Sequence, residues 1–111
     1  MKLVLAIVQD DDALDLIEEL TDNNFRVTKL ATTGGFLKSG NTTLMIGVEK
    51  EVVKDVVKVI EDVCKRRKEM VSAPTPSTIG SDSGMYMPYP IEVEVGGATV
   101  FVLDVDQFYK V

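Results

Sequence analysis

The order of apolar and polar positions predicts the first two elements of the chain. An unbroken apolar run over residues 3–8 indicates a central strand covered on at least one face. Three aspartates follow at 10–12; they suit a helix start, because acidic groups complement the dipole there and the first can cap free amides. Apolar side chains then recur at helical spacing: Ala13, Leu16, Ile17 and Leu20. Asn23-Asn24 marks the helix end, since asparagine tolerates a left-handed exit.

The middle of the chain predicts two strands and a second helix. The strands are expected over 25–33 and 44–48, and glycine and asparagine signals between them predict a connecting loop. The helix is expected from 51 to about 67, because its apolar residues keep helical spacing although valine is a poor helix former. The basic run 65–68 would then offset the negative end of the helix dipole.

The last third predicts a long loop over 72–88, which is rich in proline, serine, threonine and glycine. Residues 91–95 alternate as a strand, Gly96-Gly97 predicts a hairpin turn, and 98–103 is the expected return strand before a tail over 107–111. The fold class is therefore α+β, a ferredoxin-like βαββαβ order with an extra C-terminal strand. Both helices would cover one sheet face, and oligomerisation is the expected way to bury the other.

Composition narrows the class of protein. With 111 residues, the chain is expected to form a single domain over 1–111. A net charge of −6 argues against binding of a nucleic acid polymer. Histidine is absent, and the single cysteine, Cys64, is expected in the core of a cytoplasmic protein. No apolar run has the length of a membrane span, and we expect no targeting segment, no metal site and no cofactor.

Five features within one short stretch offer the chemistry of nucleotide binding. Arg26 presents a fork of donors that matches a phosphate, and Thr28 adds a hydroxyl on the same strand face. Gly34-Gly35 allows close backbone approach, Phe36 can stack on a base, and the Asn41 amide can read an adenine edge. Four of these features also have an ordinary alternative: a surface ion pair for the arginine, a bend for the glycine pair, a core anchor for the phenylalanine and a turn for the asparagine.

Four longer segments resemble the family of PII-like cyclic di-AMP receptors, of the PstA and DarA type. They are residues 5–10, 24–37, 40–47 and 88–101, and the resemblance covers essentially the whole chain. It implies a bacterial, non-enzymatic signal-transduction protein, a PII-like homotrimer that binds cyclic di-AMP at subunit interfaces. Loop reordering would then signal to a downstream protein whose identity the sequence does not give.

The resemblance also implies a set of ligand-binding residues. Phosphate and ribose are expected near Arg26 and Thr28, and an adenine near Phe36 and Asn41. Phe101 is expected from the same or a neighbouring subunit. The complete implied set is Asn24, Arg26, Val27, Thr28, Gly35, Phe36, Leu37, Asn41, Gly47 and Phe101.

Some segments depart from the family pattern. The long loop at 73–80 lacks the glycine-rich sequence expected for the family, and the tail at 108–111 also differs from the family pattern. The loops at 34–41 and 72–88 are the ones expected to reorder on ligand binding. The tyrosine that nitrogen-regulating PII proteins modify in the first loop has no counterpart, so no covalent regulation is implied.

Three alternatives stay open. A PII-like sensor of ATP, a 2-oxo acid or another small metabolite would share the architecture. A metal-tolerance protein of the CutA type would share the fold order. Soft metal ions are bound mainly by histidine and cysteine, however, and this chain has no histidine and one cysteine. A nucleotide-processing enzyme would want carboxylates near the phosphates, and no acidic residue lies between Asn23 and Val48.

Overall fold

The computed structural model describes residues 1–30, 40–73 and 89–111. The two loops expected to reorder therefore fall almost entirely outside the described residues, as do Gly35, Phe36 and Leu37. The chain divides into two units: Met1–Lys65 together with Gly96–Val111, and Arg66–Val95. No helix in the described part is long and apolar enough to cross a membrane.

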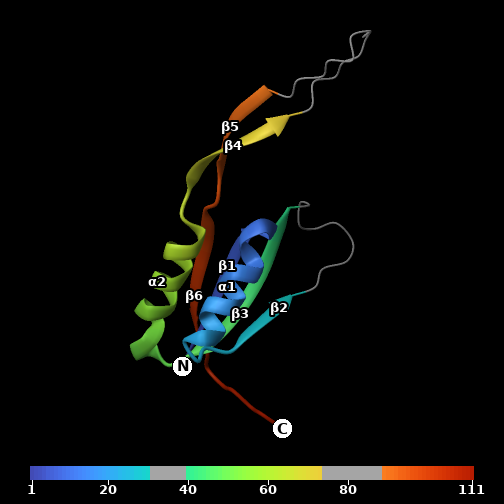
Figure 1. The fold of residues 1–111 in the computed structure, drawn as a ribbon. Helices are drawn as coiled ribbons and strands as arrows, with labels where there is room; N and C mark the ends of the chain where they lie inside the picture. Colours follow the sequence, from blue (N-terminus) through green and yellow to red (C-terminus); the bar gives the residue numbers. More distant parts are fainter. Residues whose placement is uncertain (31–39, 74–88) are drawn as a thin grey trace, which may run out of the picture. The chain divides into compact units, whose positions relative to one another are not determined.

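The first unit is an antiparallel sheet with two helices. Its strands lie in the order β2-β3-β1-β6, which is compatible with a ferredoxin-like fold and confirms the α+β class. Figure 1 shows α1 and α2 on the same side of this sheet, as the sequence predicted. The bounds are β1 Lys2–Gln9, α1 Asp10–Asp22, β2 Val27–Leu30, β3 Asn41–Val48, a 3₁₀ turn Lys50–Val52, α2 Val53–Cys64 and β6 Ala98–Asp104.

The second unit is a hairpin of β4 (Arg67–Ala73) and β5 (Tyr89–Val95). The predicted hairpin across Gly96-Gly97 is therefore wrong, because β5 pairs with β4 whereas β6 pairs with β1. The predicted extra C-terminal strand is wrong as well: β6 is the fourth strand of the main sheet, and the additional strands precede it. β6 pairs with apolar β1 but stays largely exposed, while Glu92 of β5 pairs with Lys68 of β4 and Glu94 pairs with Arg66, just before β4.

The basic run after α2 also differs from the prediction. The helix ends at Cys64, and Lys65 already has extended backbone with ψ 148°. Arg66 then pairs with Glu94 at 3.9 Å, and Lys68 with Glu92 at 3.7 Å. Most of this run therefore pairs with carboxylates along the hairpin instead of offsetting the helix dipole.

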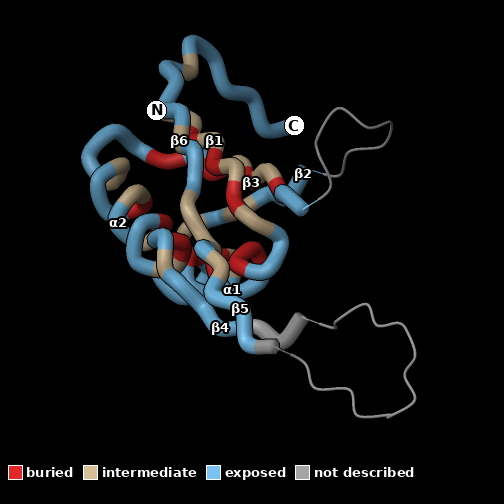
Figure 2. Tube along the Cα trace, turned by 90° about the horizontal axis from the view of Figure 1, so that it is seen from above, coloured by how far each residue is buried: buried red, intermediate tan, exposed pale blue. Residues whose placement is uncertain are grey.

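The core lies between the helices and one face of the sheet, and Figure 2 marks its buried residues in red along β1, β3 and the helices. Alternate strand residues point into it, which is the pattern of a sheet covered on one face. The predicted stripe of α1 is confirmed, with Ile17 at its partly buried margin, and Cys64 is a buried core residue. The buried hydrophobic residues are Val4, Ala6, Val8, Ala13, Leu16, Leu20, Leu44, Ile46, Val48, Val56, Ile60 and Cys64.

Candidate functional site

The sheet face opposite the helices carries several residues of the implied ligand set. The strand register pairs Thr28 with Met45, Met45 with Leu5, and Leu5 with Phe101. These four residues form one row across the sheet on the face that the helices leave uncovered. Gly47 lies on the same face, paired with Leu3 of β1. A hydroxyl, a glycine and an aromatic ring thus lie on this face around apolar residues of β1 and β3, and further polar residues lie on it nearer the first residues of β3.

The exit from α1 positions the arginine. The Asn23 Nδ2 group donates to the Glu19 carbonyl at 2.7 Å, and the Asn24 N–H donates to the Thr21 carbonyl at 2.9 Å. Asn24 has φ 67°, which confirms the predicted left-handed exit. Arg26 then lies exposed just before β2 and forms no ion pair with any other described residue. The alternative of an intramolecular surface ion pair is therefore not supported in this part of the chain.

Two neighbouring positions differ in what they can offer a ligand. Val27 is partly buried and packs against the core, so only its backbone can contribute to a site on the uncovered face. Gly47 is exposed, and a Cβ added there would meet only Met1 Cε, at an ordinary 3.9 Å. Val27 pairs with Ile46, and Arg26 directly precedes this pair on one strand's chain while Gly47 directly follows it on the other. Nothing described in the chain requires glycine here; in a strand, glycine often marks close approach of a ligand or another backbone.

Asn41 lies at the far end of β3. It is the exposed first residue of the strand and pairs with Gln9, so it belongs to the strand and the turn residue is Gly40, with φ 106°. The Asp10 N–H donates to the Gly40 carbonyl at 2.8 Å, and the Asp10 carboxylate accepts from the Thr42 hydroxyl. Asp10 thus braces β3 instead of capping α1, whose N-cap is Gln9. A hollow of about 400 Å³ at this end is lined by Gln9, Asp10, Asp11, Gly40 and Asn41.

Within one chain the implied residues do not meet in a single small pocket. Thr28 lies on one edge strand and Phe101 on the other, separated by three strand spacings, or about 14 Å. Asn41 and Gly47 lie at opposite ends of β3, roughly 20 Å apart at the usual rise per residue. Phe101 is 52% exposed, so it is accessible from outside the chain.

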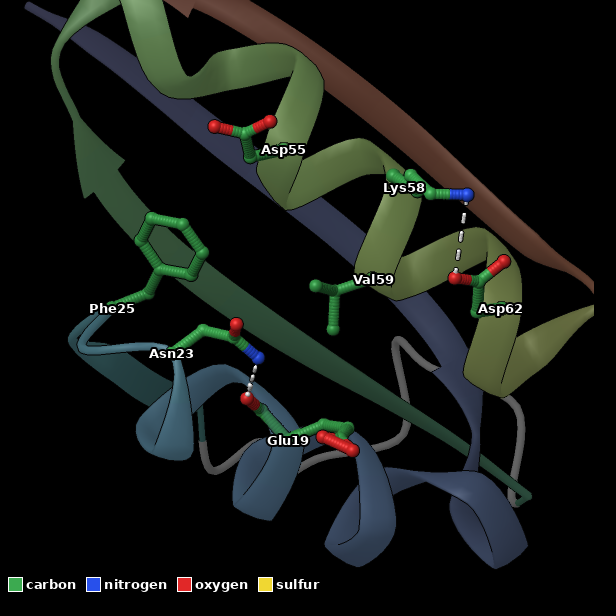
Figure 3. Close-up of a pocket in the computed structure, with 7 residues that line it drawn as sticks. All are labelled: Glu19, Asn23, Phe25, Asp55, Lys58, Val59 and Asp62. Atoms are coloured by element: carbon green, nitrogen blue, oxygen red, sulfur yellow. Dashed lines mark hydrogen bonds and ion pairs between the residues drawn. The ribbon is translucent and has the colours of Figure 1, made fainter.

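A groove between the two helices has the wrong charge for a phosphodiester. It has a volume of about 520 Å³, and Figure 3 shows side chains from both helices pointing toward it. Three carboxylates line it against one cation, Lys58, which already pairs with Asp62 at 3.7 Å. The lining residues are Glu19, Asn23, Phe25, Asp55, Lys58, Val59 and Asp62, and none belongs to the implied ligand set.

A charged pair joins the first residue of β1 to the last residue of β6. Lys2 donates a hydrogen bond to Asp104, and this bond, followed by the lysine charge, holds the pKa of Asp104 below its ordinary value.

Over the described ranges, no three histidine, cysteine, aspartate or glutamate side chains gather where they could hold a metal ion.

One residue near the site could not be singled out from the sequence. The Gln9 Oε1 atom accepts the N–H of Gly96 at 2.8 Å, across 87 residues of chain. The only local signal is a polar residue that ends the apolar run of β1 before the helix starts. Such a signal does not say which distant backbone group the side chain will meet.

The fold and the exposed face together define a small α+β protein. Side chains able to contact a ligand lie on the sheet face that its helices do not cover. A family model described as "Cyclic-di-AMP receptor" matches residues 1–111, so the chain belongs to the cyclic-di-AMP receptor family. The resemblance stated from the sequence is thereby confirmed. The chain is also similar to a functionally unknown protein from Pediococcus pentosaceus ATCC 25745, of known crystal structure. The two share 51% identity with a TM-score of 0.76, over 99% of this chain and 96% of that chain.

Proposed function

We propose that this protein is a cytoplasmic signal-transduction receptor that binds cyclic di-AMP at the interfaces of a homotrimer. The single observation that carries the proposal is the match of the whole chain to the cyclic-di-AMP receptor family. Binding reorders the two long loops, and a downstream protein reads that change. The ligand-binding residues are those that the resemblance implied.

Two features of the sheet support an interfacial site. The uncovered face exposes large apolar residues, with Leu103 43% exposed and Phe101 52% exposed, and a second copy is the natural cover for such a surface. Because Phe101 lies about 14 Å from Thr28 in the same chain, it joins a site around Arg26 most readily from a neighbouring subunit.

The chemistry of the exposed groups fits the ligand. The Arg26 guanidinium can donate to phosphate oxygens, and the Thr28 hydroxyl adds a donor on the same side of the strand. The Asn41 amide can accept from adenine N6 and donate to N7. A guanine would present an acceptor where adenine has a donor, so the same amide discriminates against cyclic di-GMP.

The role is binding without catalysis. The matching family is one of receptors, and binding with a population shift needs no nucleophile or general base. Incubation of the protein with cyclic di-AMP, followed by chromatography, is expected to return the ligand unchanged.

Calorimetric titration tests the proposal directly. We expect saturable binding of cyclic di-AMP at one ligand per chain, weaker binding of cyclic di-GMP, and no competition from ATP. Light scattering on the same sample is expected to give the mass of three chains. A protein that binds ATP more tightly than cyclic di-AMP would instead be a metabolite sensor of the PII type, and the proposal would be wrong.

A further inference from the structure

A groove with a partly apolar floor runs between the two helices of the first unit. Two hollows, of about 520 and 400 Å³, are both lined by Glu19, so they adjoin along α1. Phe25, Val59 and Val63 line this interhelical groove and are only partly buried against the core. Figure 3 shows Phe25 and Val59 pointing into the space between α1 and α2. The floor of the groove therefore leaves apolar surface open to a partner.

The walls of the groove are acidic. α1 carries seven acidic residues and no basic one, so this helix alone holds more negative charge than the whole chain, whose net charge is −6. Asp55 and Asp62 of α2 line the opposite wall. Among the described lining residues the one cation is Lys58, which already pairs with Asp62 at 3.7 Å. The exposed carboxylates of α1 are Asp11, Asp15, Glu18, Glu19 and Asp22.

This distribution of charge is unfavourable for the helix on its own. Asp15, Glu18 and Asp22 follow one another at spacings of three and four residues, so their carboxylates lie on the same side of α1 and repel. The last turn of α1 has no basic residue, so its acidic groups also meet the negative end of the helix dipole. None of the three pairs with a cation in the described part of the chain. A positively charged partner would relieve this repulsion.

We propose that the interhelical groove is the docking surface for a basic amphipathic helix of a partner protein. The apolar stripe of the partner helix packs on Phe25, Val59 and Val63, and lysine or arginine side chains beside that stripe pair with the carboxylate walls. The ring of Phe25 also offers its face to a cation. α1 has 13 residues and is about 20 Å long, which matches a partner helix of similar length.

The groove stays accessible whether or not the chain assembles through its sheet. Figure 1 shows both helices on one side of the sheet, opposite the face proposed for the trimer. Docking at the groove therefore does not depend on cyclic di-AMP or on the trimer, and the inference goes beyond the proposed function.

The test uses two synthetic peptides of leucine and lysine, each about as long as α1, in titration calorimetry. In the first, leucine recurs at helical spacing to form one apolar stripe. The second has the same composition in scrambled order. We expect the first to bind saturably, more weakly as salt is raised, and at least about tenfold more tightly than the second. In amide NMR spectra its addition is expected to shift Phe25, Val59 and Val63.

Two triple variants with the same change of net charge locate the binding. Asp15→Asn, Glu18→Gln and Asp22→Asn together neutralise the stripe of α1, and they are expected to weaken binding of the first peptide at least about tenfold, because several ion pairs are lost. This variant is expected to fold, since it relieves repulsion, and circular dichroism checks that.

The matched control neutralises three exposed carboxylates that do not line the groove. They are changed together as Glu51→Gln, Glu61→Gln and Asp106→Asn. The control is expected to bind the first peptide within about twofold of the unmodified protein, the residual effect of its lower net charge.

Unspecific attraction between opposite charges predicts different results. The two peptides would then bind alike, or the two triple variants would lose affinity equally, and either result would overturn the inference. Absence of binding by the first peptide at low salt would overturn it as well. Because both peptides are titrated without cyclic di-AMP, a failure here leaves the proposed function intact, and a failure to bind cyclic di-AMP leaves the groove assignment intact.

Discussion

At the residue scale, the exposed Arg26 is the proposed phosphate-binding residue. Arg26→Ala removes charge-assisted hydrogen bonds to the ligand, so we expect a loss of about 1.5–3 kcal/mol of binding free energy. That corresponds to roughly a ten- to hundredfold rise in the dissociation constant, measured by calorimetry. Lys29→Ala is the matched control, because Lys29 is an exposed cation of β2, three residues after Arg26, whose register with Leu44 places it on the face toward the helices. Equal losses in both variants would contradict the assignment.

A glycine on the same face makes a second residue-scale prediction. Gly47→Val is expected to preserve the fold of the subunit, because an added Cβ would meet only the flexible end of the Met1 side chain and valine is favoured in strands. The added side chain should block close approach from outside, so cyclic di-AMP binding is expected to weaken at least about tenfold, the effect of about 1.4 kcal/mol. Circular dichroism and calorimetry on one preparation separate the two effects. Unaltered affinity would show that neither ligand nor neighbouring subunit approaches Gly47.

At the element scale, the start of α1 is fastened to the start of β3. Thr42 is 7% exposed, and its hydroxyl donates to the Asp10 carboxylate. Thr42→Val removes this donor with little change in shape, so we expect the free energy of unfolding in urea to fall by about 1 kcal/mol. Thr43→Val, the next residue with its side chain on the opposite sheet face, is the control and is expected to show no such loss. If the two variants unfold alike, the brace between helix and strand does not contribute to stability.

At the scale of the whole molecule, the uncovered sheet face is the proposed surface of trimer assembly. Leu5 lies in the centre of that face, between Met45 and Phe101 in the register. Leu5→Glu would bury a carboxylate in a subunit interface, so we expect the trimer to dissociate to single chains in light scattering, with cyclic di-AMP binding lost at the same time. Leu14→Glu, at a residue that is 66% exposed on α1, is expected to stay trimeric. A Leu5→Glu protein that keeps the mass of the unmodified one would refute this use of the face.

The sequence by itself determined the features that depend on neighbouring residues. The buried stripe of α1 follows from helical periodicity, and the exit at Asn24 follows from the conformational freedom of asparagine. The polar groups of Arg26 and Thr28 are two residues apart, so their common side of the chain could also be predicted. Family membership could be recognised because long contiguous segments of the sequence resemble the family.

Only the tertiary structure decided which distant segments lie side by side. Alternation in 91–95 and 98–103 predicted two strands correctly, yet it could not tell that β6 pairs with β1 and β5 with β4. The distance of Phe101 from Thr28 and the bond from Gln9 to Gly96 depend on that pairing as well. Periodicity reports which face of a strand is apolar, whereas strand partners are chosen by the burial and charge pairing that the whole chain can achieve at once.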